Sequence, residues 1–262
     1  MNTNSNVYTI IYTTVIVVIV AAVLAFASSS LKDRQTANQK AEIIGQILTA
    51  AQFEDTSIDS YKAEIESAVL VDLEGNVVGE LDCADAQVYT VSDLKKQNYG
   101  IADKSADTKL PVYIFKNGTK VVPVYGAGLW GPVWGYIAVA SDGKIAGATF
   151  DHDSETPGLG GKIKDDPSFS AQFTGKAFNY ADTTPFAIVK GGAGNRENAI
   201  DAITGATMTS NGLGAAINTW AAAYEPVLAA VKNCCCGNGE CDGTCCGEAA
   251  AEECCQDKTV EE

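Results

Sequence analysis

Hydroxyl-bearing side chains gather in one short stretch, from Asp201 to Gly212, just before a segment with helical spacing. The small and hydroxyl-bearing members of the stretch are Thr204, Gly205, Ala206, Thr207 and Thr209. The free N–H groups and the dipole of a helix N-terminus favour a phosphate, so this stretch could hold a phosphorylated ligand. A Ser or Thr in front of a helix is also an ordinary N-cap, and the spacing alone does not choose between the two interpretations.

A second stretch, from His152 to Lys162, could contact a planar ligand. Its glycines permit close approach of the backbone, and Glu155 and Thr156 offer polar contacts. By composition alone, the same stretch is a surface loop with a turn. His152 is the only histidine of the chain, so a histidine-based metal site or a Ser-His-Asp triad would depend on it alone. The sequence contains neither a P-loop nor a dinucleotide-binding fingerprint.

Both stretches lie in a body for which the sequence predicts an α+β fold. Apolar residues recur every three or four positions over residues 32–53 and from Leu213 to Tyr224, which predicts two helices, the second ending near Pro226. Between them, pairs of short apolar runs flank Asn-Gly, Asp-Gly or Glu-Gly-Asn turns, which are typical of β-hairpins. The paired runs are 68–73 with 77–81, 112–115 with 120–124, and 136–140 with 145–150. We therefore expect antiparallel hairpins packed with helices rather than β-α-β alternation.

The N-terminal segment, residues 1–31, is expected to be a membrane anchor. It contains no charged residue, the 21 residues from Val7 to Ala27 are mostly apolar, and Val15 to Ala27 is apolar without interruption. As a helix, Val7 to Ala27 would span roughly 31 Å, about one hydrocarbon core. The alternative is a cleaved signal peptide, but the segment has no basic residue and its apolar run is long. Lys32 and Arg34 follow the span, so the positive-inside rule by itself places the body in the cytoplasm.

Residues 233–262 are expected to form a disordered acidic tail. They carry eight acidic residues and one Lys, and they hold eight of the nine cysteines of the chain. These cysteines are Cys234, Cys235, Cys236, Cys241, Cys245, Cys246, Cys254 and Cys255. Such a composition leaves little to bury. The cysteine spacing matches neither a zinc nor a ferredoxin pattern, so a soft-metal or disulfide role is the less favoured interpretation.

The charge balance excludes one class of partner. The chain has 18 Lys and Arg against 33 Asp and Glu, a formal net charge of −15. Binding to nucleic acid requires clusters of basic side chains, which the sequence lacks. We therefore expect no nucleic-acid partner.

The hydroxyl-rich stretch matches a known modification motif. Asp201-x-x-Thr-Gly-Ala-Thr-x-Thr209 fits the motif at which a periplasmic flavin transferase attaches FMN to threonine through a phosphoester, so residues 201–210 are identified as a flavinylation motif. Further matches are 126–130, 155–161 and 189–193. Together, these motifs make the chain resemble the C subunits of Na(+)-translocating NADH:quinone reductases, a family with an FMN-binding domain. The resemblance runs from the anchor to about residue 231.

The resemblance implies roles for the matching residues. Thr209 would carry FMN covalently, and Asp201 would belong to the recognition signal of the transferase. Thr204 stands where the family often has Ser, and Gly205, Ala206 and Thr207 complete the motif. The residues that would surround the isoalloxazine ring are Leu129, Trp130, Glu155, Thr156, Leu159 and Gly160. The cysteine-rich tail departs from the family pattern.

The resemblance also implies partners and a location. The chain would work in the bacterial inner membrane with subunits A, B, D, E and F, relaying electrons from NADH toward quinone while the complex exports sodium. Because the transferase acts outside the cytoplasm, the body, residues 32–232, would face the periplasm. A periplasmic location contradicts the cytoplasmic location that the positive-inside rule predicts from Lys32 and Arg34, and we give the motif more weight.

Two alternative functions are considered. One is the FMN-carrying G subunit of an Rnf-type complex, and the other is a membrane-anchored metal-binding protein that acts through its cysteine tail.

Overall fold

The computed structural model of the chain describes residues 6–229. The expected tail, residues 233–262, and its eight cysteines lie outside the described residues. The chain divides into two compact units, residues 1–42 and 43–262.

Helix α1 (Asn6–Ala50) replaces the two separate N-terminal elements that the sequence predicts. No Gly or Pro occurs between Asn6 and Ile44, so nothing ends a helix at the expected boundary between residues 31 and 32. In the first unit, the apolar side chains of α1 are exposed, and the helix is long and apolar enough to cross a membrane. The last turns of α1 belong to the second unit, where Ile44, Ile47 and Leu48 are fully buried.

A six-stranded antiparallel sheet forms the centre of the second unit, with the strand order β2-β1-β3-β4-β5-β6. The strands are β1 (Ile65–Val71), β2 (Val77–Glu80), β3 (Leu110–Phe115), β4 (Lys120–Ala127), β5 (Pro132–Val139) and β6 (Ile145–His152). The three hairpins that the sequence predicts are all present. Strands β4 and β5 also pair with each other, from Lys120 with Val139 to Ala127 with Pro132. Residues 128–131 therefore form the turn of a fourth, long hairpin.

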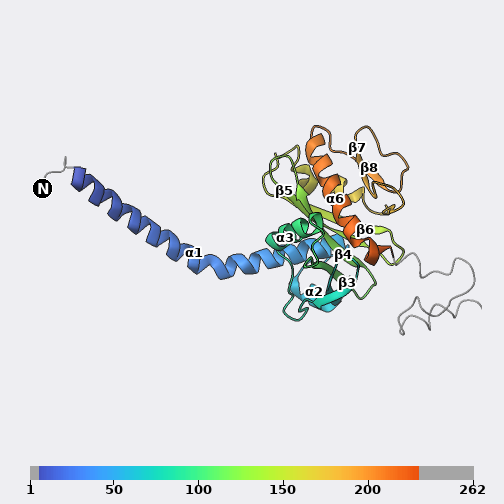
Figure 1. Cartoon of the computed structure of the whole chain (residues 1–262), viewed down its shortest axis with the longest axis horizontal. Helices are drawn as coiled ribbons and strands as arrows, with labels where there is room; N and C mark the ends of the chain where they lie inside the picture. Colours follow the sequence, from blue (N-terminus) through green and yellow to red (C-terminus); the bar gives the residue numbers. More distant parts are fainter. Residues whose placement is uncertain (1–5, 230–262) are drawn as a thin grey trace, which may run out of the picture. The chain divides into compact units, whose positions relative to one another are not determined.

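Alternate side chains of the sheet enter two separate hydrophobic cores. On one face, Val122 and Ile137 pack in a core that includes Trp220 of helix α6 (Thr207–Leu228). On the other face, Val121 and Tyr136 pack with the end of α1 and with helix α2 (Ile58–Glu64). Figure 1 shows α6, in orange, lying over the strands of the sheet. The fold is thus α+β, as predicted, with helices on both faces of the sheet.

Further elements that the sequence does not predict complete the domain. Helix α3 (Val91–Ala102) begins with a capping box formed by Thr90 and Asp93. The short helices α4 (Lys162–Asp165) and α5 (Pro167–Ala171) follow β6. Strands β7 (Ala187–Val189) and β8 (Ala199–Asp201) pair in parallel, apart from the main sheet. The shortest of these elements give almost no periodic signal.

Helix α6 differs from the prediction at both ends. It starts at Thr207 rather than Leu213, so Thr209 belongs to its first turn and not to a preceding loop. Pro226 lies inside the helix instead of ending it. This proline is exposed in the final turn, where water can reach the carbonyl group that loses its N–H partner. The indole N–H of Trp220 donates to the carbonyl of Tyr125 (2.8 Å), which ties α6 to β4.

Candidate functional site

Close packing of α6 against β4 brings residues 207–210, part of the predicted flavinylation motif, to the turn between β4 and β5. A Cβ atom at Gly126 would clash with the Cβ atom of Ala216, and one at Gly212 would clash with the carbonyl oxygen of Ala127. Only glycine at these two positions lets the helix approach the strand so closely. The first turn of α6, with Thr209, consequently lies beside residues 128–131.

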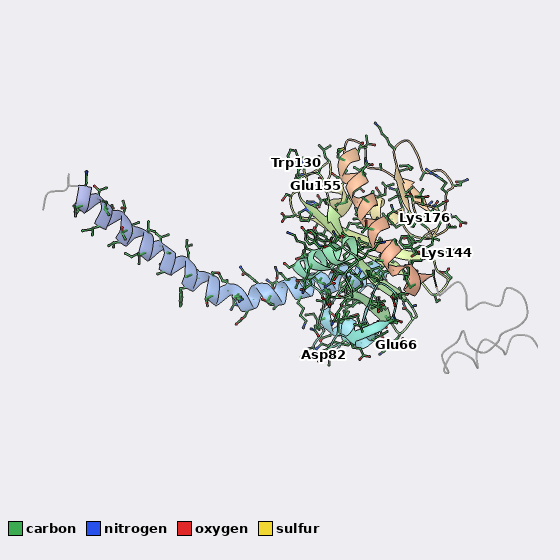
Figure 2. The ribbon with its side chains drawn as sticks, viewed as in Figure 1. Glu66, Asp82, Trp130, Lys144, Glu155 and Lys176 are labelled. Carbon is green, nitrogen blue, oxygen red and sulfur yellow. The ribbon has the colours of Figure 1, made fainter. Side chains whose placement is uncertain are left out.

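The carboxylate of Glu155 connects three segments that the sequence predicts to lie at the site. The hydroxyl of Thr209 donates a hydrogen bond to Glu155 Oε2 at 2.7 Å. The other oxygen, Oε1, accepts the backbone N–H groups of Leu129 (2.6 Å) and Trp130 (2.9 Å). Thr209 and Glu155 are only 1% and 4% exposed. Figure 2 shows Trp130 and Glu155 near each other, on the side of the domain where α6 begins.

Two glycines make room for this carboxylate. A Cβ atom at Gly128 would clash with Glu155 Oε1. A Cβ atom at Gly160 would clash with Glu155 Oε2 and would lie 2.7 Å from Thr209 Oγ1. The resemblance assigns Gly160 to the surround of a flavin ring, whereas in this structure the residue covers the hydrogen bond between Thr209 and Glu155.

The surroundings of Glu155 stabilise its ionised form. Burial by itself raises the pKa of this carboxyl group, but the hydrogen bonds from Thr209, Trp130 and Leu129 outweigh burial, and the nearby His152 acts in the same direction. The net result is a pKa below the ordinary value, so Glu155 is a carboxylate at neutral pH. His152 also holds the loop, because its Nδ1 accepts the backbone N–H of Glu155 at 3.2 Å.

The loop that carries Glu155 closes on itself through backbone hydrogen bonds. The carbonyl oxygen of Thr156 accepts the N–H groups of Leu159 (3.1 Å) and Gly161 (2.9 Å). The side chain of Thr156 is exposed, so the polar contact that the sequence predicts for it stays a prediction. The loop therefore presents Leu159 and Gly160 toward the start of α6.

The N-terminus of α6 has no side-chain cap. Its N-cap residue is Ala206, which provides no side-chain cap, so the interpretation of the hydroxyl cluster as an N-cap is wrong. The hydroxyl of Ser210 instead accepts the backbone N–H of Ile203 at 3.1 Å. Gly205, at φ +83°, makes the sharp turn into the helix. The first-turn N–H groups of a helix have no partner within it, and such groups are typical donors to a phosphate.

Four large apolar side chains are exposed around this helix end. They are Leu129, Trp130, Leu159 and Met208, and each is between 45% and 67% exposed. Trp130 and Leu129 adjoin Glu155 through their N–H groups, and Met208 precedes Thr209 in the chain. A planar, largely apolar ring such as isoalloxazine would cover part of this surface. Met208 is not predicted from the sequence, because it stands at the unspecified position of the motif.

Asp201 is joined to a different part of the domain. Its carboxylate accepts the backbone N–H of Ala193, and its own N–H donates to Gln172 Oε1 at 2.9 Å. Asp201 thus anchors the glycine-rich loop between β7 and β8. Its expected part in recognition by a transferase stays a prediction, as do the roles of Thr204 and Thr207.

A metal centre finds no support within residues 6–229. No group of three or more His, Cys, Asp or Glu side chains in this range could hold a metal ion. Cys83 is the only cysteine among these residues and is half-buried. The soft-metal role of the eight tail cysteines lies outside the described residues and stays a prediction.

Comparison with known proteins supports the flavin interpretation. The model of the FMN-binding domain family matches residues 128–222, a range that contains Leu129, Glu155 and Thr209. The C subunit of the Na(+)-translocating NADH-quinone reductase of Vibrio vulnificus (strain YJ016) is 30% identical over 234 residues, which cover 80% of this chain and 89% of the relative. The corresponding protein of Pasteurella multocida (strain Pm70) is 42% identical over 130 residues, 46% of this chain and 50% of the relative.

Solved structures agree with this result. The crystal structure of the C subunit from Parabacteroides distasonis has a TM-score of 0.63 and 30% identity, and the match covers 76% of this chain and 96% of that chain. NqrC from Shewanella oneidensis has a TM-score of 0.61 and 25% identity over 75% of this chain and 99% of that chain. The resemblance predicted from the sequence is therefore confirmed, and the chain belongs to the family of Na(+)-translocating NADH-quinone reductase C subunits.

Proposed function

We propose that this chain carries FMN, bound through a phosphoester to Thr209, as the C subunit of a Na(+)-translocating NADH:quinone reductase. The observation that carries the proposal is the position of Thr209. Its hydroxyl lies in the first turn of a 22-residue helix without a side-chain cap. Exposed apolar side chains border that end of the helix.

In this proposal the described residues would bind each part of FMN. The first-turn N–H groups of α6 and the helix dipole would stabilise the phosphate, which is a monoanion once it is esterified. Leu129, Trp130, Leu159 and Met208 would pack against the ring and exclude water from one side of it. Bound FMN supplies the capacity to pass electrons singly, so the chain needs no catalytic acid or base of its own for electron relay. Covalent attachment prevents loss of the carrier to a dilute compartment.

The rest of the proposal concerns the complex. The chain would receive electrons that originate from NADH and would pass them toward quinone, in contact with subunits A, B, D, E and F, while the whole complex translocates sodium. Its N-terminal segment, residues 1–31, would be a single-pass anchor in the inner membrane. The domain, residues 32–232, would face the periplasm, where a flavin transferase modifies it, and residues 233–262 would follow as a tail.

The attachment is tested by expressing the full chain together with a periplasmic flavin transferase. We expect a fluorescent flavin band that survives a denaturing gel and disappears in Thr209→Ala. Thr207→Ala is the matched control, because it removes a threonine hydroxyl from the same turn, and it should still accept flavin. The absence of a band for the wild-type chain, with the transferase active on another acceptor, would refute attachment of FMN. A band lost in Thr207→Ala but kept in Thr209→Ala would refute the assignment to Thr209.

A further inference from the structure

We propose that Glu155 is the base that accepts the proton of Thr209 when FMN is attached, so that the acceptor protein supplies a catalytic residue for its own modification. This inference rests on the proposed attachment at Thr209. The resemblance implies that Glu155 contacts the flavin ring, and the function as a base is separate from that contact.

The geometry is that of a nucleophile paired with a base. A hydroxyl group is a weak nucleophile until a neighbouring group takes its proton, and such a base must lie within hydrogen-bonding distance. The Thr209 hydroxyl already directs its proton to Glu155 Oε2, 2.7 Å away. A third element orients the base, because the N–H groups of Leu129 and Trp130 hold Glu155 Oε1. Nucleophile, base and orienting groups thus come from three separate segments.

The attachments of Glu155 also allow the base to stay in place when Thr209 becomes accessible. In this structure Thr209 is almost fully buried, and the backbone at Gly160 lies over its hydroxyl. The carboxylate, however, is held by the β4–β5 turn and not by Gly160. Gly158 precedes the covering residues and has a φ of +75°, and a Cβ atom added to it would meet no atom within 4 Å. An outward displacement of Leu159 and Gly160 would therefore expose Thr209 Oγ1 and leave Glu155 beside it.

The reaction balances without an oxidant or reductant. The donor is an FMN group whose phosphate is joined to a nucleotide through a phosphoanhydride, as in a flavin dinucleotide. Thr209 Oγ1 forms a bond to the FMN phosphorus, and the phosphoanhydride P–O bond breaks. The electron pair of the broken bond leaves with the nucleotide phosphate, and the proton of Thr209 passes to Glu155 Oε2.

Retention of that proton resolves an electrostatic conflict in the product. An ionised Glu155 beside a new phosphodiester would place two negative charges in contact, which is unfavourable in a site shielded from water. A protonated Glu155 is neutral and can donate a hydrogen bond to the phosphoester. The hydrogen bond from Thr209, which lowers the pKa of Glu155 before the reaction, no longer exists afterwards.

The test measures the rate of attachment, not the activity of the loaded protein. The full-length chain without flavin is mixed with purified flavin transferase and a flavin dinucleotide under single-turnover conditions, and covalent flavin is followed by gel fluorescence. Glu155→Gln keeps the size of the side chain but presents an amide NH₂ to Thr209. General bases contribute about 100- to 10,000-fold, so we expect the rate to fall at least about 100-fold without a change in the KM for the acceptor chain. Asp153→Asn is the matched control, because Asp153 is an exposed carboxylate of the same loop, and it should react at the wild-type rate.

The outcomes separate this inference from the proposed function. A loss of about 100-fold or more in Glu155→Gln, measured at a temperature well below the midpoint of its thermal unfolding, supports the base. A smaller loss overturns it, and so does a faster rate, which would mean that Glu155 holds the hydroxyl back. If the wild-type chain itself takes no flavin, attachment at Thr209 fails instead.

A second measurement keeps the inference testable if Glu155→Gln does not fold. In the wild-type chain an internal base that is already ionised makes the rate independent of hydroxide, so the rate should be level between about pH 6 and pH 8. His152 is the titratable side chain next to Glu155, and the profile is therefore repeated with His152→Gln. A rate that rises about tenfold per pH unit in both chains would overturn the inference, because hydroxide rather than Glu155 would then activate Thr209.

Discussion

Replacement of Gly160 by Ala tests whether the packed carboxylate organises the site. The added Cβ atom would clash with Glu155 Oε2 and would lie 2.7 Å from Thr209 Oγ1. Gly160 has no positive φ, so the substitution adds no backbone strain and acts through packing alone. Forcing a methyl group into a packed interior costs about 1–3 kcal/mol, and weakening a hydrogen bond to a charged group costs about 1.5–3 kcal/mol. Both costs arise from one displacement, so we expect about 2–3 kcal/mol in total.

Thermal unfolding of the full chain, followed by circular dichroism, measures this cost. A domain of this size loses about 2–4 °C of Tm per kcal/mol, which gives a decrease of about 4–12 °C for Gly160→Ala. Gly158→Ala is the matched control in the same loop. Its Cβ atom would meet nothing within 4 Å, and the left-handed backbone at φ +75° costs only about 1–2 kcal/mol. Gly160→Ala should also slow the attachment of flavin.

A double-mutant comparison identifies the atom responsible. In a Glu155→Ala background the carboxylate is absent, so Gly160→Ala should cost clearly less than in the wild type. An unchanged Tm in Gly160→Ala, or the same loss with and without Glu155, would refute the argument. In that case the absence of a side chain at residue 160 would need a reason other than the position of the Glu155 carboxylate.

Three further predictions follow from single contacts. The pKa of Glu155 lies below its ordinary value of 4.5, so its ionised form stabilises the fold above that pH, and this contribution is lost as the pH falls through the lower folded pKa. The difference in stability between the wild type and Glu155→Gln, measured by denaturant unfolding, should therefore shrink on acidification below pH 4.5. Ser210→Ala leaves the buried N–H of Ile203 without its acceptor and should cost about 1–3 kcal/mol in the same assay while covalent flavin is retained. Asp201→Ala removes the acceptor for Ala193 and should increase amide hydrogen exchange in the loop between β7 and β8; unchanged exchange there would contradict the anchoring role.

Local signals in the sequence predict most of the fold. Alternating apolar residues and Asn-Gly or Asp-Gly turns locate the hairpins, because strand period and turn conformation depend on neighbouring residues. The pairing of β4 with β5 is not predicted, since residues 128–131 contain two glycines and read as a loop. The start of α6 is also missed, because Thr207 to Gly212 are mostly small or hydroxyl-bearing residues that favour turns when considered alone.

The residues of the site are predictable, but their connections are not. The resemblance names Leu129, Trp130, Glu155 and Thr209, yet it gives them only a common neighbour, the flavin ring. In the structure they contact each other directly, across sequence separations of 26 and 54 residues. These contacts depend on the close packing of α6 against β4, which is a long-range property. Local patterns carry no information about it.

A buried carboxylate is an unexpected neighbour for a phosphate site, because the two groups are both negatively charged. The transfer of one proton would remove this repulsion. Before attachment, Glu155 balances the cost of its burial with two backbone N–H groups and the Thr209 hydroxyl, and so joins the β4–β5 turn to the start of α6. Attachment would remove the hydroxyl donor and add one negative charge at the same position. If Glu155 keeps the proton of Thr209, the charge passes from the carboxylate to the phosphodiester, and the site contains one negative charge before and after the reaction. The first-turn N–H groups of α6 can then stabilise that charge where it is newly placed. A residue that stabilises the unmodified domain would thereby also prepare it for modification.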